Sequence, residues 1–241
     1  NSNSPAYLTT LHEPLDREAY PGNFPDIGLN LRTQHALTLV HNDKKYSFEE
    51  FVEAKHSMKM LLADRVKPDL VALLEDADLN EAEKAALETL KSWDNTASAD
   101  SVGSVLFKMW WNIYRHGDND FAVEWSEEAP LAGPRGLGSP ERAVSAFREA
   151  MKETADRWGS WRVAWGDVHR LRRGDADLPL GGGSNRMGCF RICEYHEADD
   201  GKLIMDGGDS FVLVTEFGET PQAYSVCGYS QSGRPESKHY N

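Results

Sequence analysis

The sequence predicts an α+β fold with three consecutive regions. Residues 1–46 are expected to be irregular, because prolines and glycines recur throughout this stretch. Residues 47–157 are expected to be mainly helical, because apolar side chains recur there at helical spacings behind helix-capping signals. Residues 158–241 are expected to be rich in strands, because short runs of β-branched and aromatic residues alternate there with glycines.

The N-terminal region is expected to be ordered and wrapped over a surface, although little of it is regular. Prolines interrupt it at Pro5, Pro14, Pro21 and Pro25. Apolar side chains that can anchor it lie between them, at Tyr7, Leu8, Leu11, Tyr20, Phe24 and Ile27. A short helix is expected to begin within residues 26–39.

The middle region carries several helix signals. They occur at Ser47 with Glu50, at Asn80 before residues 81–91, at residues 101–114, and at Ser139 before Pro140. Ser47 and Glu50 have the spacing of a capping box, in which each side chain satisfies a backbone amide of the first helical turn. Residues 101–114 are apolar around much of a helical circumference, which is typical of a buried helix.

The C-terminal region contains short segments with strand composition. The predicted strands are residues 161–165, 189–195, 210–217 and 222–228. Within 210–217, Phe211 and Leu213 alternate with Val212 and Val214, so both faces of the strand are partly apolar. A strand that is apolar on both faces is typical of the inside of a layered sandwich.

The composition restricts the partners of the protein. The chain has 241 residues, 40 % of them hydrophobic, which suffices for one large domain or two small ones. Its net charge is −13, from 26 basic and 39 acidic residues. Nucleic acid is not expected as a partner, because phosphate neutralisation needs an excess of Lys and Arg. A membrane is not expected either, because no apolar run approaches the roughly 18 residues of a span.

Three cysteines, Cys189, Cys193 and Cys227, do not form a closed disulfide framework. If residues 189–195 form a strand, the Cα atoms of Cys189 and Cys193 lie about 13 Å apart, which is too far for a bridge. We therefore expect buried free thiols in a sheet, and the sequence leaves a pairing of Cys227 with either one open.

Motifs for metals and cofactors are missing. The chain has no HExxH, CxxC or G-x-S-x-G string. The glycines of residues 181–185 lack the lysine and the following helix of a phosphate-binding loop. We expect no cofactor and no metal-binding residues in this chain.

Four separated strings resemble segments of penicillin-acylase-family large subunits, in the family's order and spacing. They are residues 1–5 (NSNSP), 29–36 (LNLRTQHA), 165–170 (WGDVHR, followed by the Pro- and Gly-rich 178–183) and 229–240 (YSQSGRPESKHY). The last two most resemble the branch of acyl-homoserine-lactone and aculeacin A acylases. Lys238 stands where the family usually has proline. Together the strings bracket the whole chain.

The resemblance implies a partial αββα sandwich and an N-terminal-nucleophile mechanism. In that family a serine exposed by self-cleavage attacks the amide, and its own α-amine is the general base. The nucleophile is expected outside this chain. By match to the first string, Asn3 is expected to donate to the oxyanion, with Asn1 as the second choice. Arg32 matches the arginine that orients this Asn and the amine of the nucleophile.

The same resemblance gives roles to other conspicuous residues. Because the base is the α-amine, His169 and His239 are expected to be structural hydrogen-bonding residues. Ser184 follows Gly183 as in the family's cleavage site, but it lies too close to the end of the chain to begin a sandwich, so it is not expected to be the nucleophile. Trp158, Trp161 and Trp165 are expected in the core.

The resemblance also implies the setting of the chain. We expect it to be the C-terminal portion of an acylase β subunit, cut from a longer protein, with the rest of that subunit and the small α subunit as partners. The expected substrate is a small N-acyl compound such as an acyl-homoserine lactone, and the expected location is periplasmic or secreted. The resemblance leaves open whether the full enzyme binds a structural calcium ion. The alternatives are a penicillin- or cephalosporin-type acylase and a non-catalytic α+β binding module.

Overall fold

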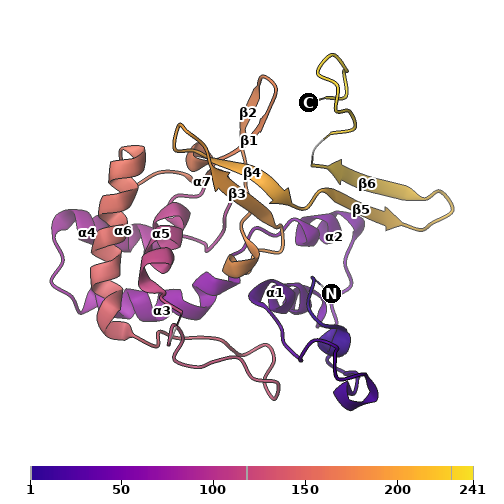
Figure 1. Ribbon diagram of the computed structural model, residues 1–241, viewed down its shortest axis with the longest axis horizontal. Helices are drawn as coiled ribbons and strands as arrows, with labels where there is room; N and C mark the ends of the chain where they lie inside the picture. The colour runs from indigo at the N-terminus through magenta and orange to yellow at the C-terminus, as the bar shows by residue number, and fades with distance from the viewer. Residues whose placement is uncertain (1, 118, 229, 241) are drawn as a thin grey trace.

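The computed structural model describes residues 2–117, 119–228 and 230–240 and has the α+β character expected from the sequence. A group of helices forms one side of the molecule, a small sheet lies beside it, and a β-hairpin projects on the other side (Figure 1). No helix in these ranges is long and apolar enough to span a bilayer.

The N-terminal region is irregular apart from two short 3-10 turns, as expected. It leads into helix α1 (Leu31–Val40), which begins within residues 26–39 as predicted. Asn30 caps this helix, because its side-chain oxygen accepts a hydrogen bond from the Thr33 amide at 2.9 Å. A small apolar cluster holds the region against the helix, formed by Tyr7, Leu8, Leu29 and Leu37.

Five helices make up most of the middle region. They are α2 (Phe48–Lys55), α3 (Leu61–Glu75), α4 (Glu81–Ser92), α5 (Ser104–Tyr114) and α6 (Ala143–Trp158). The predicted capping box of Ser47 and Glu50 is confirmed at the start of α2. Asn80 caps α4 in the same way, and a 3-10 turn from Pro140 leads into α6.

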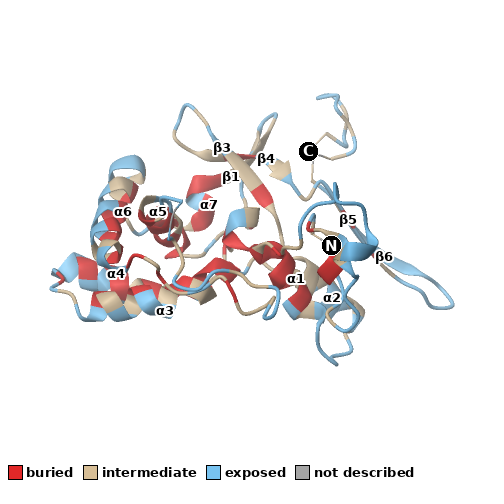
Figure 2. Ribbon diagram, turned by 60° about the horizontal axis from the view of Figure 1, so that its bottom comes forward, coloured by how far each residue is buried: buried red, intermediate tan, exposed pale blue. Residues whose placement is uncertain are grey.

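The main hydrophobic core lies between α3, α4, α5 and α6, where buried residues concentrate (Figure 2). Phe107, Trp110 and Tyr114 of α5 are almost fully buried, which confirms the predicted buried helix. Phe147 of α6 and Leu70 of α3 close the core from two other sides. Each such side chain stabilises the fold by roughly 1.5–3 kcal/mol.

A four-stranded sheet packs beside the helices in the order β2-β1-β4-β3. Its strands are β1 (His169–Arg173), β2 (Ala176–Pro179), β3 (Cys193–Glu197) and β4 (Leu203–Gly208). Strands β1 and β4 are parallel, and the other neighbours are antiparallel.

A separate hairpin pairs β5 (Phe211–Glu216) with β6 (Gln222–Cys227), and each strand lies within a predicted strand segment. On β5 the side chains of Val212 and Val214 are buried, whereas Phe211 is 63 % and Leu213 57 % exposed. One of its two apolar faces is therefore open to solvent in this chain, and the αββα sandwich stays a prediction.

The predicted strand at residues 161–165 is wrong. Ala164 makes only a single bridge with Val102, and Trp165 begins the short helix α7 (Trp165–Val168). The backbone amides of Trp165 and Gly166 bind carbonyls of the loop before α5, at 2.9 and 2.7 Å, instead of a neighbouring strand.

The predicted strand at 189–195 begins only at Cys193. Residues 189–192 are irregular, with a bend at Phe190 and Arg191 and only an isolated bridge from Ile192 to Gly183, and they separate Cys189 from β3. Cys189 and Cys193 are buried free thiols, as expected, but only Cys193 lies in a strand. Cys227 is also free and is exposed.

Candidate active site

Arg32 and Asn3 meet at the N-terminal end of helix α1. Arg32 is only 8 % exposed, and its Nη2 group donates hydrogen bonds to the side-chain oxygen of Asn3 and, at 2.5 Å, to the carbonyl of Ser2. Asn3 adopts a left-handed backbone with φ of 62°, which asparagine tolerates better than most residues. The structure therefore brings together two predicted site residues, while Asn1 lies outside the described residues.

A hydrogen-bond network fixes the segment before the helix. The hydroxyl groups of Ser4 and Thr33 are 2.6 Å apart, and the Asn30 side chain donates to Ser4 at 3.0 Å. Asn30 also caps α1, so the same residue holds both the segment and the helix. The position of Asn3 is thus set from both sides of its backbone.

The contact with Arg32 fixes the orientation of the Asn3 amide. A guanidinium has only donors, so the atom that faces it must be the amide oxygen. The NH2 group of Asn3 is then the donor end of the side chain, and the neighbouring positive charge polarises it. An amide donor held next to a buried cation can stabilise a developing oxyanion.

A cavity of about 420 Å³ adjoins this pair. Its lining includes Ser2, Asn3, Arg32, Lys55 and Phe190. Lys55 forms an ion pair of 2.8 Å with Asp209, which directly follows β4, and its ammonium lies 4.8 Å from the Phe190 ring centroid. The cavity therefore places space for a ligand next to the Asn3 amide.

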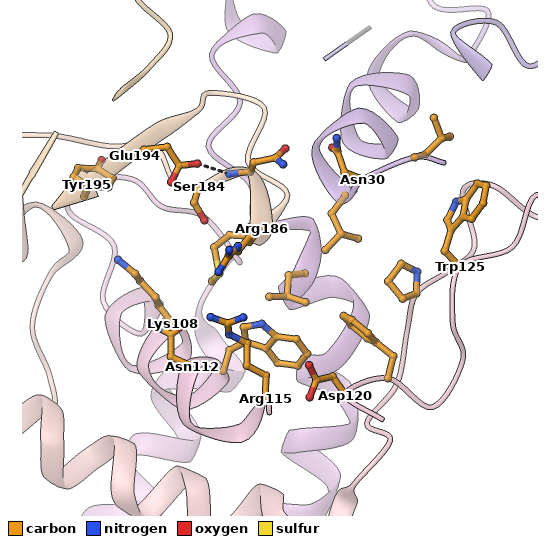
Figure 3. A pocket seen from close by; sticks show the side chains of 18 of the residues that line it. Asn30, Lys108, Asn112, Arg115, Asp120, Trp125, Ser184, Arg186, Glu194 and Tyr195 are labelled. Atoms are coloured by element: carbon orange, nitrogen blue, oxygen red, sulfur yellow. Dashed lines mark hydrogen bonds between the residues drawn. The ribbon is translucent and has the colours of Figure 1, made fainter. Parts of the chain in front are cut away.

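A second cavity of about 820 Å³ lies between α5 and residues 184–195 (Figure 3). Lys108 of α5 reaches into it and donates a hydrogen bond of 2.8 Å to Nε2 of His169. Nδ1 of His169 lies 3.1 Å from the Trp165 carbonyl, so it carries the proton, and Nε2 is the acceptor. The imidazole also stacks on the Trp165 ring at 3.5 Å.

The electrostatics of this second cavity follow from burial. Burial lowers the pKa of Lys108 to about 8, although Glu194 counteracts the change. Burial, together with the Lys108 ammonium, lowers the pKa of His169 well below its usual value, so the imidazole is neutral. His169 is thus a structural hydrogen-bonding residue, as predicted.

The remaining sequence expectations are met unevenly. Trp165 is buried in the main core, and Trp158 and Trp161 pack against it, as expected. His239 is exposed, and within the described residues its carbonyl accepts hydrogen bonds and its amide donates one, so its expected structural role stays a prediction. Ser184 lies in the wall of the larger cavity.

Sequence reasoning missed Lys108. A signal was available, because Lys108 is the only charged residue within the apolar run of residues 101–114. A lysine in the middle of a buried helix needs a partner or a cavity. Its partner, His169, belongs to a string that lies far along the sequence.

A family model described as penicillin amidase matches residues 1–241. The chain belongs to the penicillin amidase family. Among curated relatives, an acyl-homoserine lactone acylase PvdQ of Pseudomonas fluorescens is 26 % identical to this chain, over all of the chain and 32 % of the relative. A second PvdQ from another strain of that species is 28 % identical, over 99 % of the chain and 32 % of the relative.

Aculeacin-A acylase of Actinoplanes utahensis is 26 % identical to this chain, over all of the chain and 32 % of the relative. The chain thus spans about a third of the length of these relatives. Among the described residues, no group of three or more His, Cys, Asp or Glu side chains could hold a metal ion.

Proposed function

We propose that this chain supplies the oxyanion-stabilising part of an amide hydrolase of the acylase type. The observation that carries the proposal is the hydrogen bond from Arg32 to the oxygen of Asn3, beside a cavity large enough for part of a substrate. In this proposal the Asn3 amide donates to the tetrahedral oxyanion, and Arg32 acts as a positioning residue.

The nucleophile in this proposal is an N-terminal serine from outside the chain. Its α-amine takes the proton of its hydroxyl, the hydroxyl oxygen attacks the amide carbon, and negative charge moves to the carbonyl oxygen. The Asn3 NH2 group then donates to that oxygen. Collapse of this intermediate breaks the C–N bond, the leaving amine takes the proton, and water later releases the acyl group.

The names of the relatives support the class of substrate. We propose a small N-acyl compound, such as an acyl-homoserine lactone, and a periplasmic or secreted protein whose remaining β subunit and α subunit complete the site and the αββα sandwich. A penicillin- or cephalosporin-type acylase is the alternative within the family. Comparing the turnover of acyl-homoserine lactones with that of β-lactam amides separates the two.

The first test is the Asn3→Ala variant of the complete processed enzyme. Loss of one oxyanion donor is expected to lower kcat by about 10²–10³-fold, with a small effect on KM. The matched control is Asn42→Ala, since the Asn42 side chain lies at the exposed end of α1 and makes its hydrogen bonds to nearby backbone, to the Leu39 carbonyl and from the Lys44 amide. Near-normal turnover of Asn3→Ala would rule out the proposed role.

A second test concerns the chain by itself. The 241-residue chain is expected to be inactive, because the proposed nucleophile is absent from it. Amide hydrolysis by this chain, lost again in Ser184→Ala, would instead show that Ser184 is the nucleophile. The non-catalytic binding module would be favoured by two results together. The 241-residue chain would fold and bind small molecules without hydrolysing them, and the complete protein would be inactive as well.

A further inference from the structure

The cavity beside Lys108 has a charged side and an apolar side. Figure 3 shows Lys108 and Arg186 on one side of it and Trp125 on the opposite side. The apolar part of the lining also includes Leu62, Trp111 and Phe121. Its volume of about 820 Å³ is within the range of small-molecule sites. A ligand that fills it needs one polar end and one apolar end.

The charged side carries an excess of cations. Three basic side chains line the cavity, Lys108, Arg115 and Arg186, and none of them is in an ion pair within the described residues. The two acidic residues are already engaged by backbone amides. Asp120 accepts two of them at 2.9 and 3.3 Å, and Glu194 accepts one at 3.1 Å. This excess stands out in a protein with a net charge of −13.

Lys108 is held in place for binding rather than free to move. Its ammonium donates to His169 at 2.8 Å and lies 5.2 Å from the centroid of the Trp165 ring. His169 is fixed in turn by its contact with the Trp165 carbonyl and by stacking on the same ring. A neutral imidazole neutralises none of the lysine charge, so an anion in the cavity would be attracted to it.

We propose that this cavity binds an amphipathic monocarboxylate. The carboxylate lies at Lys108 and Arg186, where it accepts charge-assisted hydrogen bonds. The hydrocarbon tail lies against Phe121 and Trp125, which are only partly buried, and its burial there supplies the rest of the affinity. This inference stands on the geometry of the cavity and does not depend on the proposed acylase reaction.

The test is calorimetric titration of decanoate into the complete processed enzyme that contains this chain. Lys108→Met is expected to weaken decanoate binding by about tenfold or more, the size of one lost charge-assisted contact. Binding of decan-1-ol, which keeps the tail and lacks the charge, is expected to change less than about twofold. The matched control is Lys152→Met, whose side chain is 77 % exposed on α6.

A second variant separates binding from folding. Arg186 lies exposed on a short turn, so Arg186→Gln leaves the core intact and is expected to weaken decanoate binding several-fold. If decanoate does not bind because other parts of the enzyme fill the cavity, the inference is overturned. Binding that neither variant weakens would place decanoate elsewhere and overturn it too. Neither readout requires turnover, so loss of the proposed activity leaves this test interpretable.

Discussion

The guanidinium of Arg32 donates hydrogen bonds to both the side-chain oxygen of Asn3 and the carbonyl oxygen of Ser2. Two predicted site residues that are 29 positions apart in the sequence are thereby joined by one side chain. Because Arg32 holds both the amide and the backbone beside it through Nη2, the direction of the Asn3 NH2 group depends on where this nitrogen lies.

Replacing Arg32 with lysine is therefore not a conservative change. A lysine ammonium keeps the charge, but its shorter side chain and different donor directions do not reproduce the position from which Nη2 of Arg32 donates to both acceptors. Arg32→Lys is expected to lower kcat of the complete enzyme by roughly 10–100-fold, part of the about 10²–10³-fold effect of losing an oxyanion donor. Steady-state kinetics with a saturating amide substrate measure this directly.

The double variant decides whether Arg32 acts through Asn3. If it does, Arg32→Lys combined with Asn3→Ala should be little slower than Asn3→Ala alone, since residues that act as a unit are non-additive. Fully multiplicative losses would mean that Arg32 has a separate role, and the positioning hypothesis would fail.

Local sequence signals predicted where α2 and α4 begin, because the deciding interactions are local. The caps at Ser47 and Asn80 need only residues within one turn, and both are present as predicted. The strand at residues 161–165 failed for the opposite reason. The amides of that segment bind carbonyls of the loop before α5, and no short pattern encodes such a partner.

In the candidate site too, the sequence indicated individual residues but not the long-range contacts between them. The residues Asn3 and Arg32 came from family strings, whereas their contact depends on how residues 2–4 fold back on α1. The pairing of Lys108 with His169 joins α5 to a residue 61 positions later. Composition and periodicity carry no information on such long-range pairs.

Lys108 is expected to make stability depend on pH. Its pKa is about 8 in the folded protein, against roughly 10.4 in an unfolded chain. Between these values the unfolded chain holds a proton that the folded chain has released, so this group makes the free energy of unfolding rise with pH. The rise is at most about 3 kcal/mol, since one pKa unit is about 1.4 kcal/mol.

The measurement compares urea unfolding of the wild type and Lys108→Met from pH 7 to pH 10. Other groups titrate in both proteins, so the informative quantity is the difference in unfolding free energy between them. Wild type should gain on the variant as the pH rises through 8. A difference that stays constant over this range would show that Lys108 titrates normally.

Gly188 is expected to be intolerant of a side chain. Its φ is 74°, and a Cβ atom there would lie 2.9 Å from Cβ of Leu61 and 3.0 Å from Cβ of Leu31. Gly188→Ala should destabilise the protein by about 2–4 kcal/mol, from left-handed strain plus overpacking. Gly159→Ala is the control, because φ is 81° there but no atom lies within 4 Å. It should cost only the strain, roughly 1–2 kcal/mol. Equal losses of stability would show that the contacts around Gly188 relax freely.

The exposed apolar face of β5 gives a test of the predicted sandwich. Phe211 and Leu213 point to solvent in this chain, although their neighbours Val212 and Val214 are buried. If a second sheet from the rest of the enzyme covers this face, Leu213→Ser should lower the melting temperature of the complete enzyme by several degrees, through the loss of about 1–3 kcal/mol of apolar burial. The control is Ala223→Ser on the paired strand β6, where little apolar area is lost. In the 241-residue chain the same Leu213→Ser change should reduce aggregation, because it removes exposed apolar surface at a sheet. A complete enzyme that melts at the same temperature with and without Leu213→Ser would mean that this face stays in solvent, and the sandwich would have to be built elsewhere.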